Sequence, residues 1–470
     1  MYISKGCFRV TNFHSDQCLI SEKTSRSAHY FLNAKSVIPG GVSANIKYFS
    51  PHPIFMEKGN GSRLVDVDGN EYLDYLLCYG ALLLGHGHPE VTSAVYNQLT
   101  STGTTVFGAP HVLEVEMANK LIDYFPGIEM VRYTNSGLEA TLLAIRIAQA
   151  YTGKATLAKF EGHYHGGYNE VLLSVNPTID EAGHEKRPNS VPESKGISER
   201  YVENTVILPF NDLESTAQLL KKYKDEVAAV IIEPIQGGFI PAEKSFMEGL
   251  RKLTKDLGIL LIFDEVKTGF RLTLGGAQSI YGIKPDLTAL GKVLGGGFPI
   301  GAVGGLRDIM EIMNPSNGGD ILSAGGKAAQ KEDVLFHSGT YNGHPIVLAA
   351  GIATIKVLEG ANVYPELIQK TDYLRSSLEK LYNSYGIPMQ TVGVGSIFNI
   401  VHANHPIRNY RDLIKADMNF RKKLDDELLK LGIYTKPLNR YSMSIVHSEE
   451  DLNETISKHE KAIRKVKGIE

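Results

Sequence analysis

An aspartate and a lysine in two nearby apolar segments are the pair of residues best suited to chemistry. Asp264 ends the apolar run LLIFD, which has the composition of a strand buried on both faces. Lys292 lies between apolar residues and a glycine run in ALGKVLGGG. Burial disfavours a charged amine, so we expect Lys292 to have a lowered pKa and to be nucleophilic. The pair fits pyridoxal 5'-phosphate (PLP): Asp264 would pair with the pyridinium nitrogen, and Lys292 would form a Schiff base with the aldehyde.

Lys267 is the competing lysine because it lies only three residues after Asp264. Its surroundings, VKTGFR, are those of a polar turn, so we expect its side chain to be solvated. A single lysine in an apolar strand is usually an edge residue whose amine reaches water. The glycines around Lys292 argue against that interpretation, and we assign the Schiff base to Lys292.

A phosphate site is predicted where NSGLEA (135–140) follows the strand-like MVRYT and opens a helix. The first N–H groups of a helix have no intrahelical acceptor and bind phosphate readily. Ser136 would add a hydroxyl, and Gly137 would allow close approach. The alternative is an ordinary helix cap. Because Asp264 and Lys292 are expected nearby, we favour the phosphate site over an ordinary cap.

Three further motifs supply candidate cofactor contacts. Tyr164 in EGHYHGG could stack on a flat pyridine face. Gln236 in EPIQGG follows a strand and would lie at the carboxyl edge of the sheet, where it could bond the ring oxygen or cap its own turn. Thr340 in HSGTYNGHP could donate to a phosphate or to its own loop.

The elements that must position these residues predict an α/β fold with a mostly parallel central sheet. Between about residues 89 and 305, helical segments alternate with apolar runs typical of strands covered on both faces. These runs are ATLAKF, EVLLSV, TVILPF, AAVIIEP and ILLIFDEV. Residues 55–75 predict a small antiparallel meander. Residues 176–200 and 314–333 are polar and rich in Pro or Gly, and they predict long loops near the substrate entrance.

We therefore expect four parts in the chain. They are an N-terminal extension (1–30), the N-terminal part of a small domain (31–88), a large PLP-binding α/β domain (89–345) and a C-terminal small domain (346–470).

Composition favours a soluble cytoplasmic protein with small-molecule substrates. A net charge of −3 and a pI near 6.6 give no electrostatic reason to expect nucleic acid or a membrane surface. The three cysteines are odd in number and lack metal spacing, which indicates free thiols in a reducing compartment. Two H-x-H pairs, at 86–88 and 163–165, lack the context of a zinc site, so no metal is predicted.

Taken in order, these motifs resemble those of the class III PLP-dependent aminotransferases, in particular the glutamate-1-semialdehyde 2,1-aminomutase-like branch. The matching segments are NSGLEA, EGHYHGG, EPIQGG, FDEVKTGFR, LGKVLGGGFPIGA, HSGTYNGHP, IPGGV, DVDGNEYLDY, GHGHPEV and GAPHVLEVEMA. The resemblance runs from about residue 30 to the C-terminus. It implies PLP-dependent transferase fold type I, a smaller α+β domain built from the two chain ends, and a homodimer with shared active sites.

The resemblance also implies roles by position. Val266 and Tyr164 would lie on the two faces of the cofactor ring. Thr340 would reach the phosphate from the neighbouring subunit. The remaining positions keep the roles given above: Lys292, Asp264, Ser136, Gly137 and Gln236.

Four departures from the aminomutase pattern concern the substrate. Lys47 replaces the arginine that would clamp a substrate carboxylate, and it lacks the bidentate fork. Tyr79 stands where a tryptophan is expected. Leu138 stands where threonine is usual, which should spare phosphate binding because the backbone N–H remains. Arg440 in TKPLNRYSM is a candidate substitute clamp.

These departures favour an aminotransferase that moves an amino group from an amino-acid donor to a keto or aldehyde acceptor. The alternative is an aminomutase that uses the same residues. A non-catalytic interaction protein would require a broken site, yet Asp264, Lys292 and the phosphate motif are intact. No G-x-G-x-x-G opens a helix after the first strand, which argues against a dehydrogenase.

Overall fold

The computed structural model describes residues 23–317 and 334–469. Most of the expected N-terminal extension and of the loop at 314–333 therefore lies outside the described residues. A seven-stranded sheet has the order β4-β12-β11-β10-β7-β5-β6. In chain order its strands are β4 (Met130–Thr134), β5 (Thr156–Phe160), β6 (Thr205–Leu208), β7 (Val227–Ile232), β10 (Leu260–Asp264), β11 (Leu287–Gly291) and β12 (Gly301–Gly305). Strand β12 is antiparallel to β11 and β4, and the other pairs are parallel.

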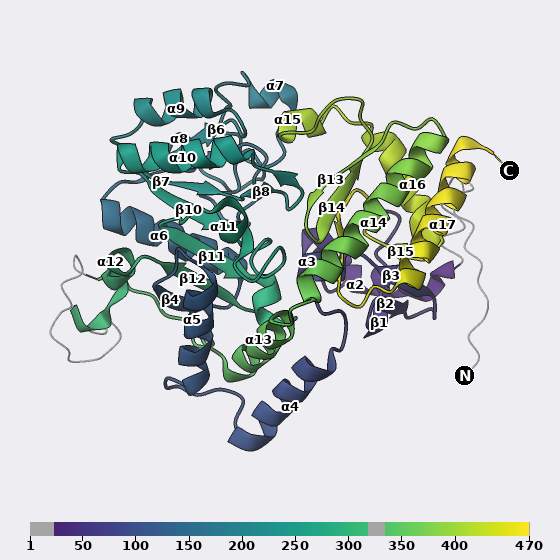
Figure 1. The fold of residues 1–470 in the computed structure, drawn as a ribbon, viewed down its shortest axis with the longest axis horizontal. Coiled ribbons are helices and arrows are strands. Elements are labelled where there is room, and N and C mark those ends of the chain that lie inside the picture. Colours follow the sequence, from purple (N-terminus) through teal and green to yellow (C-terminus); the bar gives the residue numbers. More distant parts are fainter. Residues whose placement is uncertain (1–22, 318–333, 470) are drawn as a thin grey trace.

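Both faces of this sheet are covered by helices, as its apolar strands require. Along β7, Val230 and Ile232 pack in the same core as Phe246 of α10 (Lys244–Leu257). The alternating residues Ala229 and Ile231 pack in another core, which includes Ile145 of α6 (Gly137–Thr152). In Figure 1, α9 (Leu213–Lys222) and α10 lie across one side of the sheet. The predicted mostly parallel α/β sheet is confirmed.

A smaller α+β part is built from the two chain ends. The predicted meander is present as the antiparallel strands β1 (Met56–Asn60), β2 (Arg63–Asp66) and β3 (Glu71–Asp74). The C-terminal strand β15 (Ile433–Tyr434) pairs in parallel with β3 and joins the ends in one sheet. A second sheet contains β13 (Gln390–Val394), β14 (Ile397–Val401) and β16 (Tyr441–Ser442). The predicted domain boundaries stay predictions.

The smaller part also contains three long C-terminal helices. Figure 1 shows α14 (Val363–Ser384), α16 (Met418–Lys430) and α17 (Glu449–Lys467) with the C-terminal strands. The other long helices are α2 (Ser25–Lys35), α4 (Pro89–Thr102), α5 (Val112–Tyr124) and α13 (Pro345–Leu358). In the described ranges, no single helix is long and apolar enough to cross a membrane. The pair α13 and α14, bent by 76°, satisfies that length and composition test only when taken together.

One predicted strand, EVLLSV (170–175), is wrong. Ser174 has a φ of 47°, and only an isolated bridge pairs Leu173 with Pro192. The Leu173 carbonyl accepts a hydrogen bond from the buried amine of Lys159 at 2.5 Å. Because β5 already has β6 and β7 as neighbours, this apolar segment has no open sheet edge to join there, and a lysine satisfies its carbonyl instead.

Candidate active site

The predicted chemical residues follow strands that end at one edge of the large sheet. Asp264 is the last residue of β10 and is the register partner of Ala289 in the parallel strand β11. Lys292 follows β11 directly, and Ser136 follows β4 after one intervening residue. Parallel strands present their carboxyl ends together, and this is where open α/β sheets bind ligands.

Lys292 is a partly buried amine in a strained backbone position. Its φ is 48°, which non-glycine residues adopt only where the surroundings fix it. Burial, assisted by the positive charges of Lys267 and Arg440, lowers the pKa of Lys292 to about 7. A large fraction of the amine is therefore neutral and nucleophilic near pH 7. The predicted lowering of this pKa is confirmed.

Asp264 is held in one orientation by two hydrogen bonds. Its Oδ2 atom lies 2.7 Å from Nδ1 of His165, and its Oδ1 atom accepts from the Val266 N–H at 3.0 Å. Both Asp264 and His165 are buried. In the sequence, His165 stands out only as half of an H-x-H pair, and its contact with Asp264 was not predicted. The signal was available, because β5 and β10 both end at this edge and each motif follows its strand.

The predicted phosphate end is closely packed around two glycines. Ser136 caps α6, and its Oγ accepts from the Glu139 N–H at 3.2 Å. A Cβ on Gly137 would lie 2.5 Å from Cγ1 of Val266. A Cβ on Gly291 would lie 3.2 Å from the Gly137 Cα. The structure thus brings the phosphate motif, Val266 and the strand that precedes Lys292 together.

Glu233 connects Tyr164, the residue predicted to stack on the ring, with Lys267. Its Oε2 accepts from the backbone N–H of Tyr164 at 2.9 Å, and its carboxylate forms an ion pair with Lys267. The Lys267 amine lies 5.8 Å from the centroid of the Tyr164 ring. Only 12% of the Lys267 side chain is exposed, so the prediction of a solvated lysine is wrong. A carboxylate 34 positions away in sequence provides the charge partner.

The residues predicted to bind the substrate, Lys47, Tyr79 and Arg440, lie in the smaller part of the molecule. The Tyr79 hydroxyl donates to the Ile46 carbonyl at 2.7 Å. Nη2 of Arg440 donates to the Tyr79 carbonyl at 3.5 Å, and the buried Nε of Arg440 has no partner among the described residues. Burial lowers the pKa of Arg440. Lys47 is exposed and donates to Ser43 Oγ at 2.9 Å.

Tyr79 belongs to a left-handed turn that a buried arginine holds in place. Leu77, Cys78 and Tyr79 have φ values of 46°, 52° and 57°. Nη2 of Arg271 donates to the carbonyl of Gly80, which ends this turn, at 2.8 Å, and Nη1 donates to the carbonyl of Met443 at 2.9 Å. Burial lowers the pKa of Arg271 to about 9. Arg271 was not among the predicted site residues.

Thr340 is exposed, and its predicted contact with a neighbouring subunit stays a prediction. Its segment nevertheless lies beside the phosphate motif of the same chain. Nδ2 of Asn135 donates to Oδ1 of Asn342 at 2.9 Å.

The residues at this edge fit PLP. The amide oxygen of Gln236 is buried and unpartnered within the described chain, as expected of a group that awaits a ligand. The start of α6 retains N–H groups that the helix cannot satisfy. Lys292, Asp264 and Tyr164 supply an amine, a carboxylate and a half-exposed ring. Among the described residues, no group of three or more His, Cys, Asp or Glu side chains is placed to hold a metal ion.

Comparison with known proteins agrees with this arrangement. The family model described as Aminotransferase class-III matches residues 46–463. The chain belongs to the class III aminotransferases. This makes it a PLP-dependent enzyme of fold type I.

Relatives of two kinds are similar over almost the whole chain. A glutamate-1-semialdehyde 2,1-aminomutase of Persephonella marina is 40% identical over 451 residues, which cover 94% of this chain and 100% of that one. An omega-transaminase of Sphaerobacter thermophilus is 34% identical with a TM-score of 0.86, covering 94% of this chain and 98% of that one. A beta-phenylalanine aminotransferase of Variovorax paradoxus is 30% identical with a TM-score of 0.82, covering 97% of each chain.

Proposed function

We propose that this class III enzyme is an aminotransferase that takes the amino group of a carboxylate-bearing donor and passes it to a keto or aldehyde acceptor. One observation carries this proposal: Lys292, a lysine with a lowered pKa, and Asp264, a buried aspartate, follow neighbouring strands at the same edge of the sheet. The incompletely paired cation Arg440 on the substrate side supports a substrate with a carboxylate.

The chain's own residues then have distinct tasks. When bound, PLP supplies an aldehyde that captures amines and a ring that withdraws electrons. Lys292 would hold the aldehyde until the amine of the donor displaces it, and its freed Nζ would then move the proton from the substrate's α-carbon to the cofactor. Asp264, oriented by His165, would keep a proton on the ring nitrogen. Tyr164 and Val266 would lie on the two faces of the ring.

The remaining cofactor contacts are assigned from their positions. Ser136 and Gly137 would bind the phosphate at the start of α6. The amide of Gln236 would bond the ring oxygen, and exchanging the two ends of the amide would turn an N–H toward the same place. Thr340 would reach the phosphate of the partner subunit.

Substrate recognition is assigned to Arg440, with Tyr79 and Lys47 as neighbours of the entrance. A guanidinium can form two parallel hydrogen bonds with a carboxylate, and its planar fork makes that contact specific. Arg440 has Nε free of protein partners in the described chain and only one long hydrogen bond from Nη2. Lys47 is farther out, exposed and bonded to Ser43.

A second function, intramolecular 2,1-aminomutase activity, is favoured by one specific observation. Curated relatives named glutamate-1-semialdehyde 2,1-aminomutase are 40% and 42% identical over 94% and 92% of this chain. The same lysine and aspartate would serve that reaction. The amino group would return to a different carbon of the same molecule, and no separate keto acid would be formed.

A half-reaction with L-glutamate separates the two functions. The purified holoenzyme is mixed with L-glutamate while the visible absorbance of the bound cofactor and the yield of 2-oxoglutarate are followed. We expect loss of the visible band with one equivalent of 2-oxoglutarate per active site. A band that persists with L-glutamate, together with rearrangement of glutamate-1-semialdehyde without any added acceptor, would replace the aminotransferase proposal with the aminomutase.

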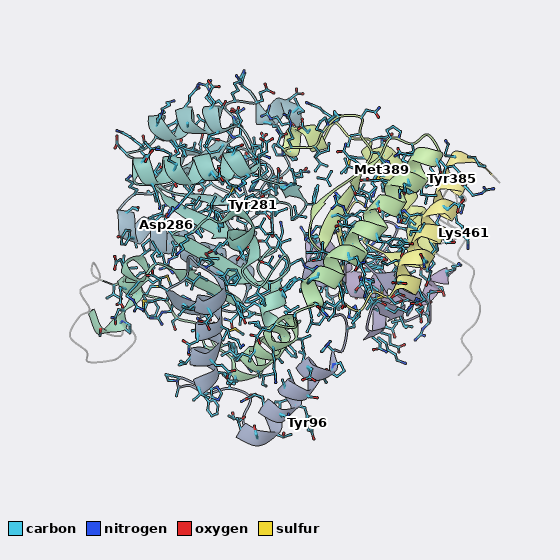
Figure 2. The ribbon with its side chains drawn as sticks, in the orientation of Figure 1. Tyr96, Tyr281, Asp286, Tyr385, Met389 and Lys461 are labelled. Carbon is cyan, nitrogen blue, oxygen red and sulfur yellow. The ribbon has the colours of Figure 1, made fainter. Side chains whose placement is uncertain are left out.

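We also infer a homodimer, located in the cytoplasm. Helices α4 and α5 expose large apolar side chains, among them Tyr96, Val112 and Val115, and Tyr96 projects outward from α4 in Figure 2. Apolar exposure of this kind is typical of surfaces that other chains cover. Sedimentation of the holoenzyme should give a mass of about twice 51.6 kDa. A monomer at micromolar concentration would contradict this inference.

A further inference from the structure

The loop that carries Arg440 has a backbone conformation that other residues must maintain. Residues 435–440 connect β15 to β16. Two of them, Lys436 and Leu438, have φ values of 57° and 66° although neither is glycine. Such conformations cost free energy and persist only where the surrounding contacts fix them. The direction of the Arg440 guanidinium depends on this backbone, because Leu438 and Asn439 immediately precede it.

A buried ion pair on α16 supplies the contacts that fix the loop. Oδ2 of Asp425 accepts from the Leu438 N–H at 2.7 Å, and Nη2 of Arg421 donates to the Asn439 carbonyl at 2.8 Å. Nε of Arg421 lies 2.8 Å from each Asp425 oxygen. The two side chains are 3% and 1% exposed. This ion pair therefore hydrogen-bonds to both residues before Arg440, through the N–H of Leu438 and the carbonyl of Asn439.

The pair is itself anchored to the sheet of the smaller part. Nη1 of Arg421 donates to Oδ1 of Asn399 at 3.0 Å and to the carbonyl of Ile400, both on β14. Figure 1 shows α16 on the same side of the molecule as the C-terminal strands. The Arg440 loop is thus tied to a helix and a strand rather than to its own residues alone.

A buried ion pair is a poor device for stability, because the desolvation of both charges offsets most of their attraction. Its polar contacts are better suited to selecting one conformation of a loop. We propose that Arg421 and Asp425 are positioning residues for Arg440 and thereby set the affinity of the enzyme for the carboxylate of its substrate. This inference rests on the carboxylate-binding role of Arg440 proposed above. Both side chains are buried, and we assign neither of them a direct contact with the substrate or the cofactor.

The test compares two small probes that differ in a carboxylate. Carboxymethoxylamine and methoxyamine carry the same aminooxy group, which would form an oxime with the bound cofactor and release the Lys292 amine, but only the first has a carboxylate. Their second-order rate constants with the holoenzyme are followed by the absorbance of the bound cofactor. The ratio of the two rate constants reports the carboxylate contact and does not require knowledge of the natural substrate.

The main variant replaces the pair by apolar residues, Arg421→Met with Asp425→Leu, because leaving one buried charge unpaired would threaten folding. We expect the probe ratio to fall by roughly 10- to 100-fold, since a small misplacement of a binding group has effects of this size. The dissociation constant for PLP, measured by fluorescence titration, should stay within about twofold of the wild-type value. A folded double variant with the wild-type ratio would overturn the inference.

A matched control lies one residue further along the same helix. Lys422 and Asp426 form an ion pair at 2.8 Å with the same spacing, but it is partly exposed and, within the described chain, neither side chain hydrogen-bonds to residues 435–440. Lys422→Met with Asp426→Leu should keep the probe ratio. A fall in this control equal to that of the main variant would attribute the effect to helix α16 in general and overturn the inference.

Two further variants complete the design. If Arg440→Met leaves the ratio unchanged, the proposed role of Arg440 fails. If Arg440→Met lowers the ratio and the double variant does not, only the positioning inference fails. Should the double variant not fold, Arg421→Lys is used, which keeps a cation beside Asp425 but removes the planar fork that donates to the Asn439 carbonyl. It should lower the ratio by at least about threefold, and an unchanged ratio would refute the inference.

Discussion

Replacing Arg440 with methionine should separate substrate recognition from stability. The guanidinium makes one long intramolecular hydrogen bond, from Nη2 to the Tyr79 carbonyl at 3.5 Å, and its Nε has no partner among the described residues. Burial also lowers the pKa of Arg440, which means that the folded protein disfavours its charge. Loss of the cation should therefore change the free energy of unfolding by less than about 1 kcal/mol, or increase it.

The effect on a carboxylate ligand should be much larger. Hydrogen bonds to charged groups contribute about 1.5–3 kcal/mol, and each 1.4 kcal/mol corresponds to about a factor of ten. The ratio of the rate constants for carboxymethoxylamine and methoxyamine should therefore fall by roughly 10- to 150-fold in Arg440→Met. Arg440→Lys keeps the charge but loses the planar fork, so its ratio of rate constants should lie between those of Arg440→Met and the wild type. A normal ratio in a folded Arg440→Met protein would refute the assignment of the carboxylate to Arg440.

Three further changes test the cofactor side of the site. Lys267→Gln removes a positive charge that lowers the pKa of Lys292, so the midpoint of PLP capture by the apoprotein should move upward from about pH 7. Capture needs the neutral amine and is lost as the pH falls below that midpoint; an unmoved or lower midpoint would contradict the electrostatic argument. Gly137→Ala would place a Cβ 2.5 Å from Cγ1 of Val266 and should weaken PLP binding in a fluorescence titration by at least about tenfold. Gly108→Ala, where a Cβ would meet nothing within 4 Å, is the control, and equal affinities would refute the packing argument. Asp264→Asn keeps the size but loses the charge, so the half-reaction should slow by at least about 100-fold, and a wild-type rate would remove Asp264 from the mechanism.

The sequence predicted the features that depend on local composition. Strands β5, β6, β7 and β10 are apolar along nearly their whole length because both of their faces are covered, and such runs are easy to recognise. The same burial predicted the lowered pKa of Lys292. Strand β12 was harder to predict from the sequence, because GAVGG has a weak strand propensity. Its glycines are required by packing: a Cβ on Gly301 would lie 2.1 Å from the Ser136 carbonyl oxygen.

Long-range contacts could not be predicted from local patterns. His165 meets Asp264 only because β5 and β10 end at the same edge of the sheet. Lys267 has polar neighbours in sequence, yet a carboxylate that follows β7 pairs with it. Arg440 was a candidate because its segment departs from the aminomutase pattern, and its unpartnered Nε became evident only in the folded chain. In each case the missing information is which distant segment supplies the partner.

The most direct test of the central claim is to identify the lysine that holds the cofactor. The holoenzyme is reduced with borohydride, which fixes PLP to its lysine, and the digested protein is analysed by peptide mass spectrometry. We predict that the label is on Lys292, in the peptide that follows strand β11. A label on Lys267, or a protein that binds PLP without any lysine being labelled, would contradict the account.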